Sequence, residues 1–308
     1  MSRPCSVDRI LSLSVLALWC WLPVLAQAGQ STLVLGRVSD DPKAHYERLK
    51  PLLDYVVPKM ADLGIRDGRV LMARDAQQMV SYLRQGKVDW ITETSGAALG
   101  FAERANARIF LRSRRGGLFD YRSVFFARKD SGIHGIEDLQ GRALGLQHPM
   151  STTAYLVPAA ILLNHGIPLA IQASPLDKPP PEFVGYVFAR SESNLVTWVQ
   201  KGLVDAAAFS NQDWEELQQA SPAIASELVV FHQSREFPRA LELVRAGLDP
   251  AIEQRLREIL LAAHDDPAAR PALDAYLRTE RFDEVDQLTW AALENLRDGV
   301  RRVRAEIE

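Results

Sequence analysis

Short apolar runs alternate with amphipathic stretches through most of this chain, and this alternation limits the possible folds more than any other feature. Thr32–Gly36 and Arg69–Met72 are typical of buried strands. Pro42–Leu63 has the spacing of a helix, and Asp41 before it is a helix-start signal. The loops between these segments are short, which favours neighbouring strands covered by helices. We therefore predict an α/β fold on a mainly parallel sheet.

The same pattern restarts after Gly116-Gly117, where Tyr121–Ala127 predicts a long strand and Ser151 begins a helix to about Asn164. We expect two α/β lobes joined by hinge strands, with a ligand cleft where the carboxyl ends of the strands face each other. The predicted divisions are residues 29–120 for lobe 1, 121–227 for lobe 2 and 228–308 for a return to lobe 1. Residues 250–308 are predicted to be wholly helical.

The first 28 residues differ from the rest and have the order of a secretory signal peptide. Arg3 and Arg9 give a positive start, and an apolar run follows over Ile10–Leu25. The small residues Ala26-Gln27-Ala28 then predict cleavage between Ala28 and Gly29. We therefore expect a mature protein in the periplasm.

Composition excludes several classes of protein. The net charge of -3 gives no basic footprint for nucleic acid, and no later segment is apolar enough for the mature chain to span a membrane. Cys5 and Cys20 both precede the predicted cut, which leaves no thiol in the mature chain. We predict neither a metal site nor a cofactor. The cluster of Arg112, Arg114 and Arg115 is interpreted as a solvated loop.

Three consecutive hydroxyls mark a candidate binding site. Ser151, Thr152 and Thr153 open a predicted helix, directly after a loop that contains His148. Hydroxyls beside the free N–H groups of a helix start can bind an oxyanion. The alternative is simple capping of the helix by Ser151, which needs only one hydroxyl.

This site lies within a longer resemblance. The order and spacing of several segments resemble the phosphate/phosphite/phosphonate-binding receptors of ABC transporters over about residues 31–215. The segments are Pro51–Tyr55, Gly86–Asp89, Tyr121–Val124, Asp130–Ile133, Asp138–Arg142, Ser151–Pro158 and Gly202–Ala208.

The resemblance implies a type II periplasmic-binding fold that holds a small oxyanion between its lobes. It implies that the three hydroxyls grip the oxyanion and that Tyr121 contacts the ligand from the hinge. Glu192 and Asp205 would meet an amine on the ligand from lobe 2. A packed hinge aromatic remains the alternative for Tyr121, and a structural carboxylate remains the alternative for Asp205.

The sequence departs from the family after the third strand, where the family has a Gly-Pro loop. Glu93 here places a carboxylate in the expected cleft, while Thr94 and Ser95 can donate at the next helix start. A carboxylate repels a dianionic ligand unless the ligand carries a cation or Glu93 is protonated. We therefore hypothesise a zwitterionic ligand. In the alternative, Glu93 binds Arg37, which can also pair with the ligand.

Three functions are open to a two-lobed ligand-binding protein of this kind. The first is a transport receptor that delivers its ligand to an inner-membrane ABC permease. The second is a periplasmic sensor for a membrane signalling partner such as a histidine kinase. An enzyme would need Ser151 and His148 as nucleophile and base, and we do not expect one.

Overall fold

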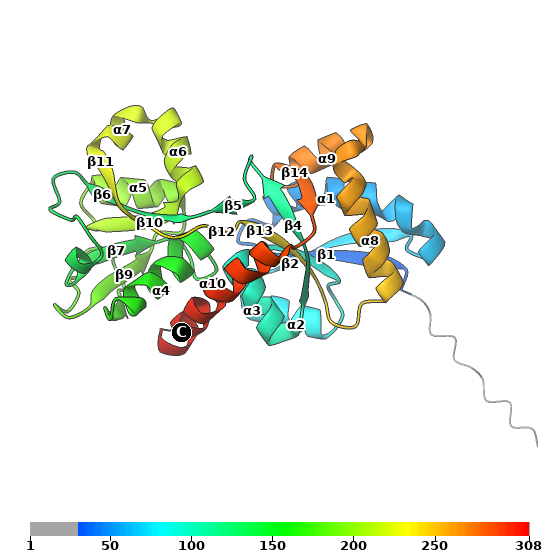
Figure 1. Ribbon diagram of the computed structural model, residues 1–308, viewed down its shortest axis with the longest axis horizontal. Helices are drawn as coiled ribbons and strands as arrows, with labels where there is room; N and C mark the ends of the chain where they lie inside the picture. The colour runs from blue at the N-terminus through cyan, green and yellow to red at the C-terminus, as the bar shows by residue number, and fades with distance from the viewer. Residues whose placement is uncertain (1–29, 308) are drawn as a thin grey trace, which may run out of the picture.

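The computed structural model describes residues 30–307, which form two α/β lobes joined by a short pair of strands (Figure 1). Each lobe is built on a six-stranded sheet with helices packed against it. The predicted two-lobed α/β fold is therefore confirmed. The predicted signal peptide, residues 1–28, lies outside the described residues.

Lobe 1 has a mixed sheet. Its strand β1 runs parallel to β2 and β3, whereas β13 is antiparallel to β3 and β4. In order across the sheet, the strands are β14 (Thr279–Asp283), β4 (Arg108–Arg115), β13 (Ala240–Val244), β3 (Trp90–Thr94), β1 (Thr32–Val38) and β2 (Asp67–Ala73). Its helices are α1 (Pro42–Val56), α2 (Ala76–Arg84), α3 (Ser95–Ala105), α8 (Pro250–Ala262) and α9 (Arg270–Ala275).

Lobe 2 repeats this design, with β7 parallel to β9 and β10, and β6 antiparallel to β10 and β11. Its strands in order are β11 (Leu228–Gln233), β6 (Ser123–Arg128), β10 (Ala206–Ser210), β7 (Ala143–Leu146), β9 (Val184–Phe188) and β8 (Leu169–Ile171). Its helical segments are η3 (Thr152–Leu156, one π turn), α4 (Val157–Asn164), α5 (Glu192–Gln200), α6 (Asn211–Ala220) and α7 (Pro222–Glu227).

Local sequence signals explain the helix boundaries in lobe 1. The Asp41 carboxylate accepts a hydrogen bond from the N–H of Ala44 at 3.1 Å, and Asp75 caps α2 in the same way. Both starts agree with the sequence analysis. The predicted helix over residues 42–63 is not α-helical throughout. Residues 57–63 continue it as a 3₁₀ segment, which is wound more tightly than an α-helix.

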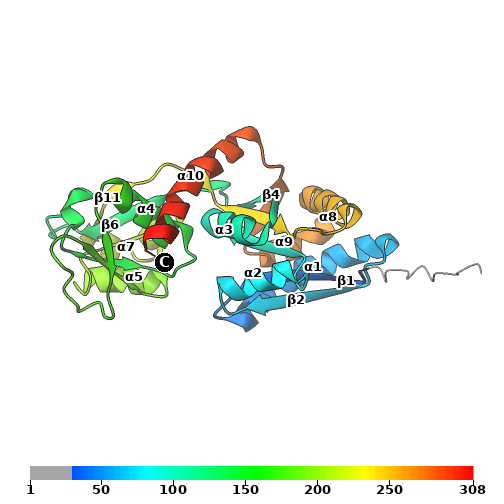
Figure 2. The same ribbon diagram turned by 90° about the horizontal axis from the view of Figure 1, so that it is seen from below.

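The lobes are connected by the strands β5 (Asp120–Tyr121) and β12 (Phe237–Pro238), which pair antiparallel, and by helix α10 (Gln287–Glu306). Helix α10 packs against α3 of lobe 1 and α4 of lobe 2, as Figure 2 shows. Strand β11 still pairs with β6 in the second sheet. The chain therefore returns to lobe 1 after Gln233, later than the expected boundary at residue 227.

Two predicted elements were wrong. Residues 250–308 are not wholly helical, because β14 lies among them and pairs antiparallel with β4. Leu277 and Arg278 have positive φ, so the backbone turns there and ends the helical run. The predicted strand over residues 121–127 is interrupted at Arg122, whose N–H donates to the Asn211 side chain instead of to a strand.

Candidate functional site

Two helical segments of opposite lobes begin directly beside each other. Helix α3 begins at Ser95, immediately after β3, and η3 begins at Thr152 in the loop after β7. The Thr152 hydroxyl lies 2.9 Å from the Thr94 hydroxyl and 2.9 Å from the backbone nitrogen of Gly96. The free N–H groups of a helix start favour anions, so this meeting point is a candidate oxyanion site.

The start of α3 lacks a cap of its own. Thr94 occupies the N-cap position, but its side chain makes no capping hydrogen bond. The Ser95 hydroxyl is fully buried and has no hydrogen-bond partner among the described residues. Buried polar groups nearly always have a partner, and a ligand that supplied an acceptor here would satisfy this one.

The three hydroxyls at the start of η3 have different roles. The Ser151 hydroxyl accepts from the N–H of Ala154 at 3.1 Å, so Ser151 caps this helical segment, as the alternative interpretation expected. Thr152 is 1% exposed and contacts lobe 1. Thr153 is also buried, and its carbonyl accepts from the Ser123 hydroxyl. Only Thr152 of the three bridges the lobes through a hydrogen bond in this structure.

Tyr121 lies at the hinge, in β5. Its ring packs edge-on against Phe237 with ring centroids 5.0 Å apart, and the Arg239 guanidinium lies 5.7 Å from its centroid. The buried hydroxyl has no partner of good hydrogen-bonding geometry among the described residues. Burial raises the pKa of Tyr121 to about 12, partly opposed by Arg239 and the Thr152 hydroxyl. The side chain is therefore a neutral donor beside the candidate site.

Glu93 lies at the end of β3 and is buried. Burial raises the pKa of its carboxyl, while Arg37, Arg115 and the backbone N–H groups of Val38 and Thr94 act in the opposite direction. Within the described residues, Arg37 forms no ion pair with Glu93, although its charge acts on the Glu93 pKa, and its guanidinium donates to the Thr92 carbonyl at 3.1 Å. The expected alternative, a direct Glu93–Arg37 pair, is therefore not what the structure shows.

A buried network supports the lobe 1 side of the candidate site. Glu242 on β13 is fully buried and pairs with Arg115 at 3.2 Å. Its carboxylate also accepts from the side chains of Trp90, Thr92, Ser113 and Tyr276. The interpretation of Arg112, Arg114 and Arg115 as a solvated loop was wrong, since all three lie on β4 and Arg115 is 3% exposed.

His148 and Glu192 lie on the lobe 2 side. The His148 pKa is lowered by burial and by Arg37 and Arg190, while Asp40 opposes them, which places this ring near residues of both lobes. Its Nδ1 accepts from the N–H of Met150, and the Ser151 N–H donates to the His148 carbonyl at 3.0 Å. Among the described residues, no hydrogen bond is found between the His148 ring and the Ser151 hydroxyl, which accepts from the N–H of Ala154. Glu192 begins α5 and accepts from the Gln147 side chain, and burial raises its pKa.

Asp205 does not lie with the other candidates. It is exposed at the amino end of β10, where its carboxylate accepts from the N–H of Ala143 at 2.8 Å. The candidate oxyanion site follows the carboxyl ends of β3 and β7, so the structure does not bring Asp205 to it. Asp213 was not expected from the sequence; it follows the carboxyl end of β10 and forms a capping box with Ser210. The Ser-x-x-Asp spacing after a strand was the available signal.

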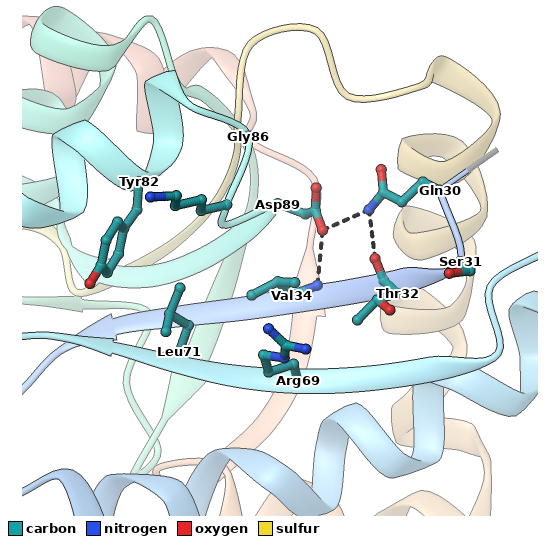
Figure 3. Close-up of a pocket in the computed structure, with 10 residues that line it drawn as sticks. Gln30, Ser31, Thr32, Val34, Arg69, Leu71, Tyr82, Gly86 and Asp89 are labelled. Carbon is teal, nitrogen blue, oxygen red and sulfur yellow. Dashed lines mark hydrogen bonds between the residues drawn. The ribbon is translucent and has the colours of Figure 1, made fainter. Parts of the chain in front are cut away.

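A separate hollow of about 710 Å³ lies beside the first residues of β1 (Figure 3). Its buried polar side chain is Asp89, which is fully engaged: the carboxylate accepts from Gln30, from the N–H of Val34 and from Arg245. This hollow lies at the amino ends of β1 and β3, away from the candidate oxyanion site. Its polar groups serve to hold the chain's first strand.

Within residues 30–307, no group of three or more His, Cys, Asp or Glu side chains is arranged to hold a metal ion. None of the described helices combines the length and apolar character needed to cross a bilayer.

The sequence matches the family described as "ABC transporter, phosphonate, periplasmic substrate-binding protein" over residues 36–290. Among solved structures, the chain is similar to XAC2383 from Xanthomonas citri, with 46% identity and a TM-score of 0.87. The match covers 90% of this chain and 100% of XAC2383 in its structure bound to a chloride ion. A second structure of XAC2383 is bound to ATP and covers 91% of this chain.

A more distant structure shares the fold. PhnD1 from Prochlorococcus marinus, in complex with methylphosphonate, is 15% identical with a TM-score of 0.67, and the match covers 89% of this chain and 98% of PhnD1. These similarities confirm the expected type II periplasmic-binding fold. Because the family match covers most of the sequence, this chain belongs to the periplasmic substrate-binding proteins of phosphonate ABC transporters.

Proposed function

We propose that this protein is a periplasmic transport receptor whose lobes close around a small molecule carrying an oxyanion. The observation that carries the proposal is the Ser95 hydroxyl, which is buried without a hydrogen-bond partner among the described residues. The buried Tyr121 hydroxyl lies beside the Thr152 hydroxyl. Ser95 belongs to the uncapped start of α3, and the Thr152 hydroxyl lies 2.9 Å from the Gly96 nitrogen of that start. Two neutral donors beside a helix start suit an oxyanion that must later be released.

Charged side chains around this point support an anionic ligand. Arg37 lies at the end of β1, and its influence on the pKa values of His45 and His148 places it near residues of both lobes. The solved relatives hold methylphosphonate, chloride and ATP. We therefore propose a phosphonate or phosphate ester as the ligand class, with its phosphoryl group near Ser95, Tyr121 and Arg37.

Glu93 refines this ligand class. Its carboxyl is buried near the site without an ion pair in the described residues, and burial raises its pKa. An ammonium group on the ligand would stabilise the ionised form. We propose that an aminoalkylphosphonate binds better than the matching alkylphosphonate. Glu93→Gln should reduce this preference, and an equal preference in both proteins would contradict a zwitterionic ligand.

Hinge closure is the proposed mechanism. The lobes are joined by the short pair β5–β12 and by α10, which can accommodate a relative rotation with small backbone changes. A ligand that contacts both lobes shifts the equilibrium toward the closed state by its extra affinity for that state. We propose that the closed receptor then meets a membrane permease, after the signal peptide over residues 1–28 has been removed.

A thermal-shift panel tests the proposal. The mature protein is heated with phosphate, methylphosphonate, aminoethylphosphonate, ATP, sulfate and an alkanesulfonate. A ligand at about 100 times its dissociation constant adds roughly 2.7 kcal/mol of stability, so a hit raises the melting temperature clearly. Ser95→Ala should weaken the response to the best phosphoryl compound. No response to any compound would contradict the proposed ligand class.

A further inference from the structure

Arg239 follows strand β12 at the hinge, and its guanidinium lies 5.7 Å from the centroid of the Tyr121 ring. We infer that Arg239 determines the charge of the ligand: its guanidinium selects a dianionic phosphoryl group over a monoanionic group of the same shape, and Gln212 of lobe 2 positions it for that role. This inference rests on the proposed function, and neither residue was expected from the sequence.

The hydrogen-bond partner of Arg239 is an amide and not a carboxylate. Its Nε donates to the Gln212 Oε1 at 3.0 Å, whereas Arg115 of lobe 1 pairs with the Glu242 carboxylate at 3.2 Å. Within residues 30–307, Arg239 forms no ion pair, and its two Nη groups donate to no acceptor. An amide oxygen satisfies one N–H of a guanidinium without cancelling its charge. The positive charge and the outer N–H groups of Arg239 are therefore available to a ligand.

The charges around Arg239 balance it only in part. Burial lowers its pKa, opposed by Tyr121, Asp213 and Glu216, while Arg278 acts in the same direction as burial. The two carboxylates have closer partners, because Asp213 forms the capping box of α6 and Glu216 pairs with Arg278 at 3.0 Å. A partly buried cation in this setting is stabilised by an anionic group beside it.

Gln212 connects this cation to the opposite lobe. It lies in the first turn of α6 and is 9% exposed. A Cβ atom placed on Gly116, in the turn after β4 of lobe 1, would lie 2.6 Å from the Gln212 Nε2. Arg239 itself leads into β13 of lobe 1. The bond between Gln212 and Arg239 thus joins the lobes, so closure of the lobes also orders the guanidinium.

The position of Arg239 places its charge beside the candidate oxyanion site. The Tyr121 hydroxyl, on the ring next to the guanidinium, lies beside the Thr152 hydroxyl at the start of α3. Neutral hydroxyls and backbone N–H groups bind tetrahedral oxyanions of either charge, whereas the attraction of a cation grows with the charge of the ligand. We therefore expect methylphosphonate, as a dianion, to bind more tightly than methanesulfonate, a monoanion of the same shape.

Isothermal titration with these two compounds, at a pH where methylphosphonate is a dianion, tests the inference. Arg239→Gln should weaken methylphosphonate binding by about 10- to 100-fold, as expected for the loss of a charged hydrogen-bond donor, and methanesulfonate binding by clearly less. Arg37 remains in this variant, so binding is weakened and not lost. Arg122→Gln is the matched control, because Arg122 pairs with Glu236, and both of its affinities should be those of the wild type.

A second variant separates positioning from a purely structural role. Gln212→Glu keeps an acceptor for the Arg239 Nε but adds a carboxylate that cancels its charge. Methylphosphonate binding should therefore weaken in this variant more than methanesulfonate binding does. A purely structural link between the lobes predicts unchanged binding, because the hydrogen bond is retained. Thermal melting of each variant confirms that it is folded.

Several outcomes would overturn the inference. Equal losses for both compounds in Arg239→Gln, or unchanged methylphosphonate binding in either Arg239→Gln or Gln212→Glu, would show that Arg239 does not determine the charge of the ligand. A wild type that binds methanesulfonate at least as tightly as methylphosphonate would overturn it and leave the oxyanion receptor in place. A wild type that binds neither compound would contradict the proposed ligand class as well.

Discussion

The two lobes bring different helix starts to the candidate site. On the lobe 1 side, α3 begins without a side-chain cap, and the strands behind it carry the buried charges of Glu93, Arg115 and Glu242. On the lobe 2 side, η3 is capped by its own Ser151. One helix start is therefore satisfied from within its lobe, while the other donates its Gly96 N–H to an acceptor on the opposite lobe.

Because of this difference, we expect the two lobes to contribute differently to ligand binding. The satisfied start in lobe 2 needs no ligand to be stable, whereas the start of α3 depends on an outside acceptor. Buried charges in lobe 1 hold the ends of β3 and β13 in place behind that start. We therefore expect changes on the lobe 1 side to affect stability and binding more strongly than matching changes in lobe 2.

The largest expected effect comes from the buried ion pair. Arg115→Met leaves the Glu242 carboxylate buried without its cation, and such losses cost about 3–5 kcal/mol. Chemical denaturation measures the change in the free energy of unfolding. Arg114→Met is the matched control, because that exposed side chain pairs with Glu280 at the surface and should change stability by less than about 0.5 kcal/mol. Equal losses in both variants would remove the distinction between the buried and exposed pairs.

The next effect concerns the contact between the lobes. Gly96→Ala introduces a methyl group 2.7 Å from the Leu156 side chain, and this overpacking should cost about 1–3 kcal/mol. Thermal unfolding and small-angle scattering would show lower stability and separated lobes. Gly100→Ala on the same helix meets only the end of the Arg304 side chain and should be tolerated. A Gly96→Ala protein as stable and compact as the wild type would contradict the contact.

A smaller effect separates the two helix starts. Ser151→Ala removes a cap and should cost about 1 kcal/mol. Thr94→Val removes a hydroxyl that caps nothing but accepts from the buried Thr152 hydroxyl, which would be left without that acceptor. An unpaired buried donor costs about 1–3 kcal/mol, so the lobe 1 substitution should cost at least as much in denaturant unfolding. A clearly smaller loss for Thr94→Val than for Ser151→Ala would contradict this comparison.

The smallest effect is a pH dependence. Burial raises the pKa of Glu93 above its ordinary value of 4.5, so the folded protein holds that proton more tightly than the unfolded chain. Its contribution to stability is present below the ordinary pKa and falls as pH rises through the higher folded pKa. Glu93→Gln should therefore gain stability relative to the wild type between pH 4 and pH 7. A relative gain toward acid pH would show the opposite sign and contradict the shift.

Much of the fold was predictable because its elements carry local signals. Capping at Asp41 and Asp75 and the apolar runs of the inner strands have their own signature in sequence. Strand β14 has no such local signal. Its charged residues resemble those of the helices around it, and only its pairing with β4 makes it a strand. The two-residue strand β12 was missed because Phe237-Pro238 is too short to show a pattern, and only its pairing with β5 makes it a strand.

The candidate site was predictable only in part. The hydroxyl triplet beginning at Ser151 could be seen in the sequence, but the bond between Thr152 and Gly96 joins residues 56 positions apart. The pairing of Arg115 with Glu242 spans 127 positions and was equally invisible. The strand after Asp205 was predicted correctly, but Asp205 was expected at the ligand. The sequence does not show which end of that strand lies at the candidate site, because this depends on the assembled sheet.

One measurement tests the central claim most directly. Amide nitrogen–proton spectra of the mature protein are recorded while methylphosphonate is added, and the signals of Gly96 and Ala154 are compared. The account predicts a large, saturable shift at Gly96, which lies at the uncapped start of α3 beside Ser95, and a small shift at Ala154, whose N–H remains capped by Ser151. A saturable shift at Ala154 with Gly96 unchanged would place the oxyanion on lobe 2 and contradict the account.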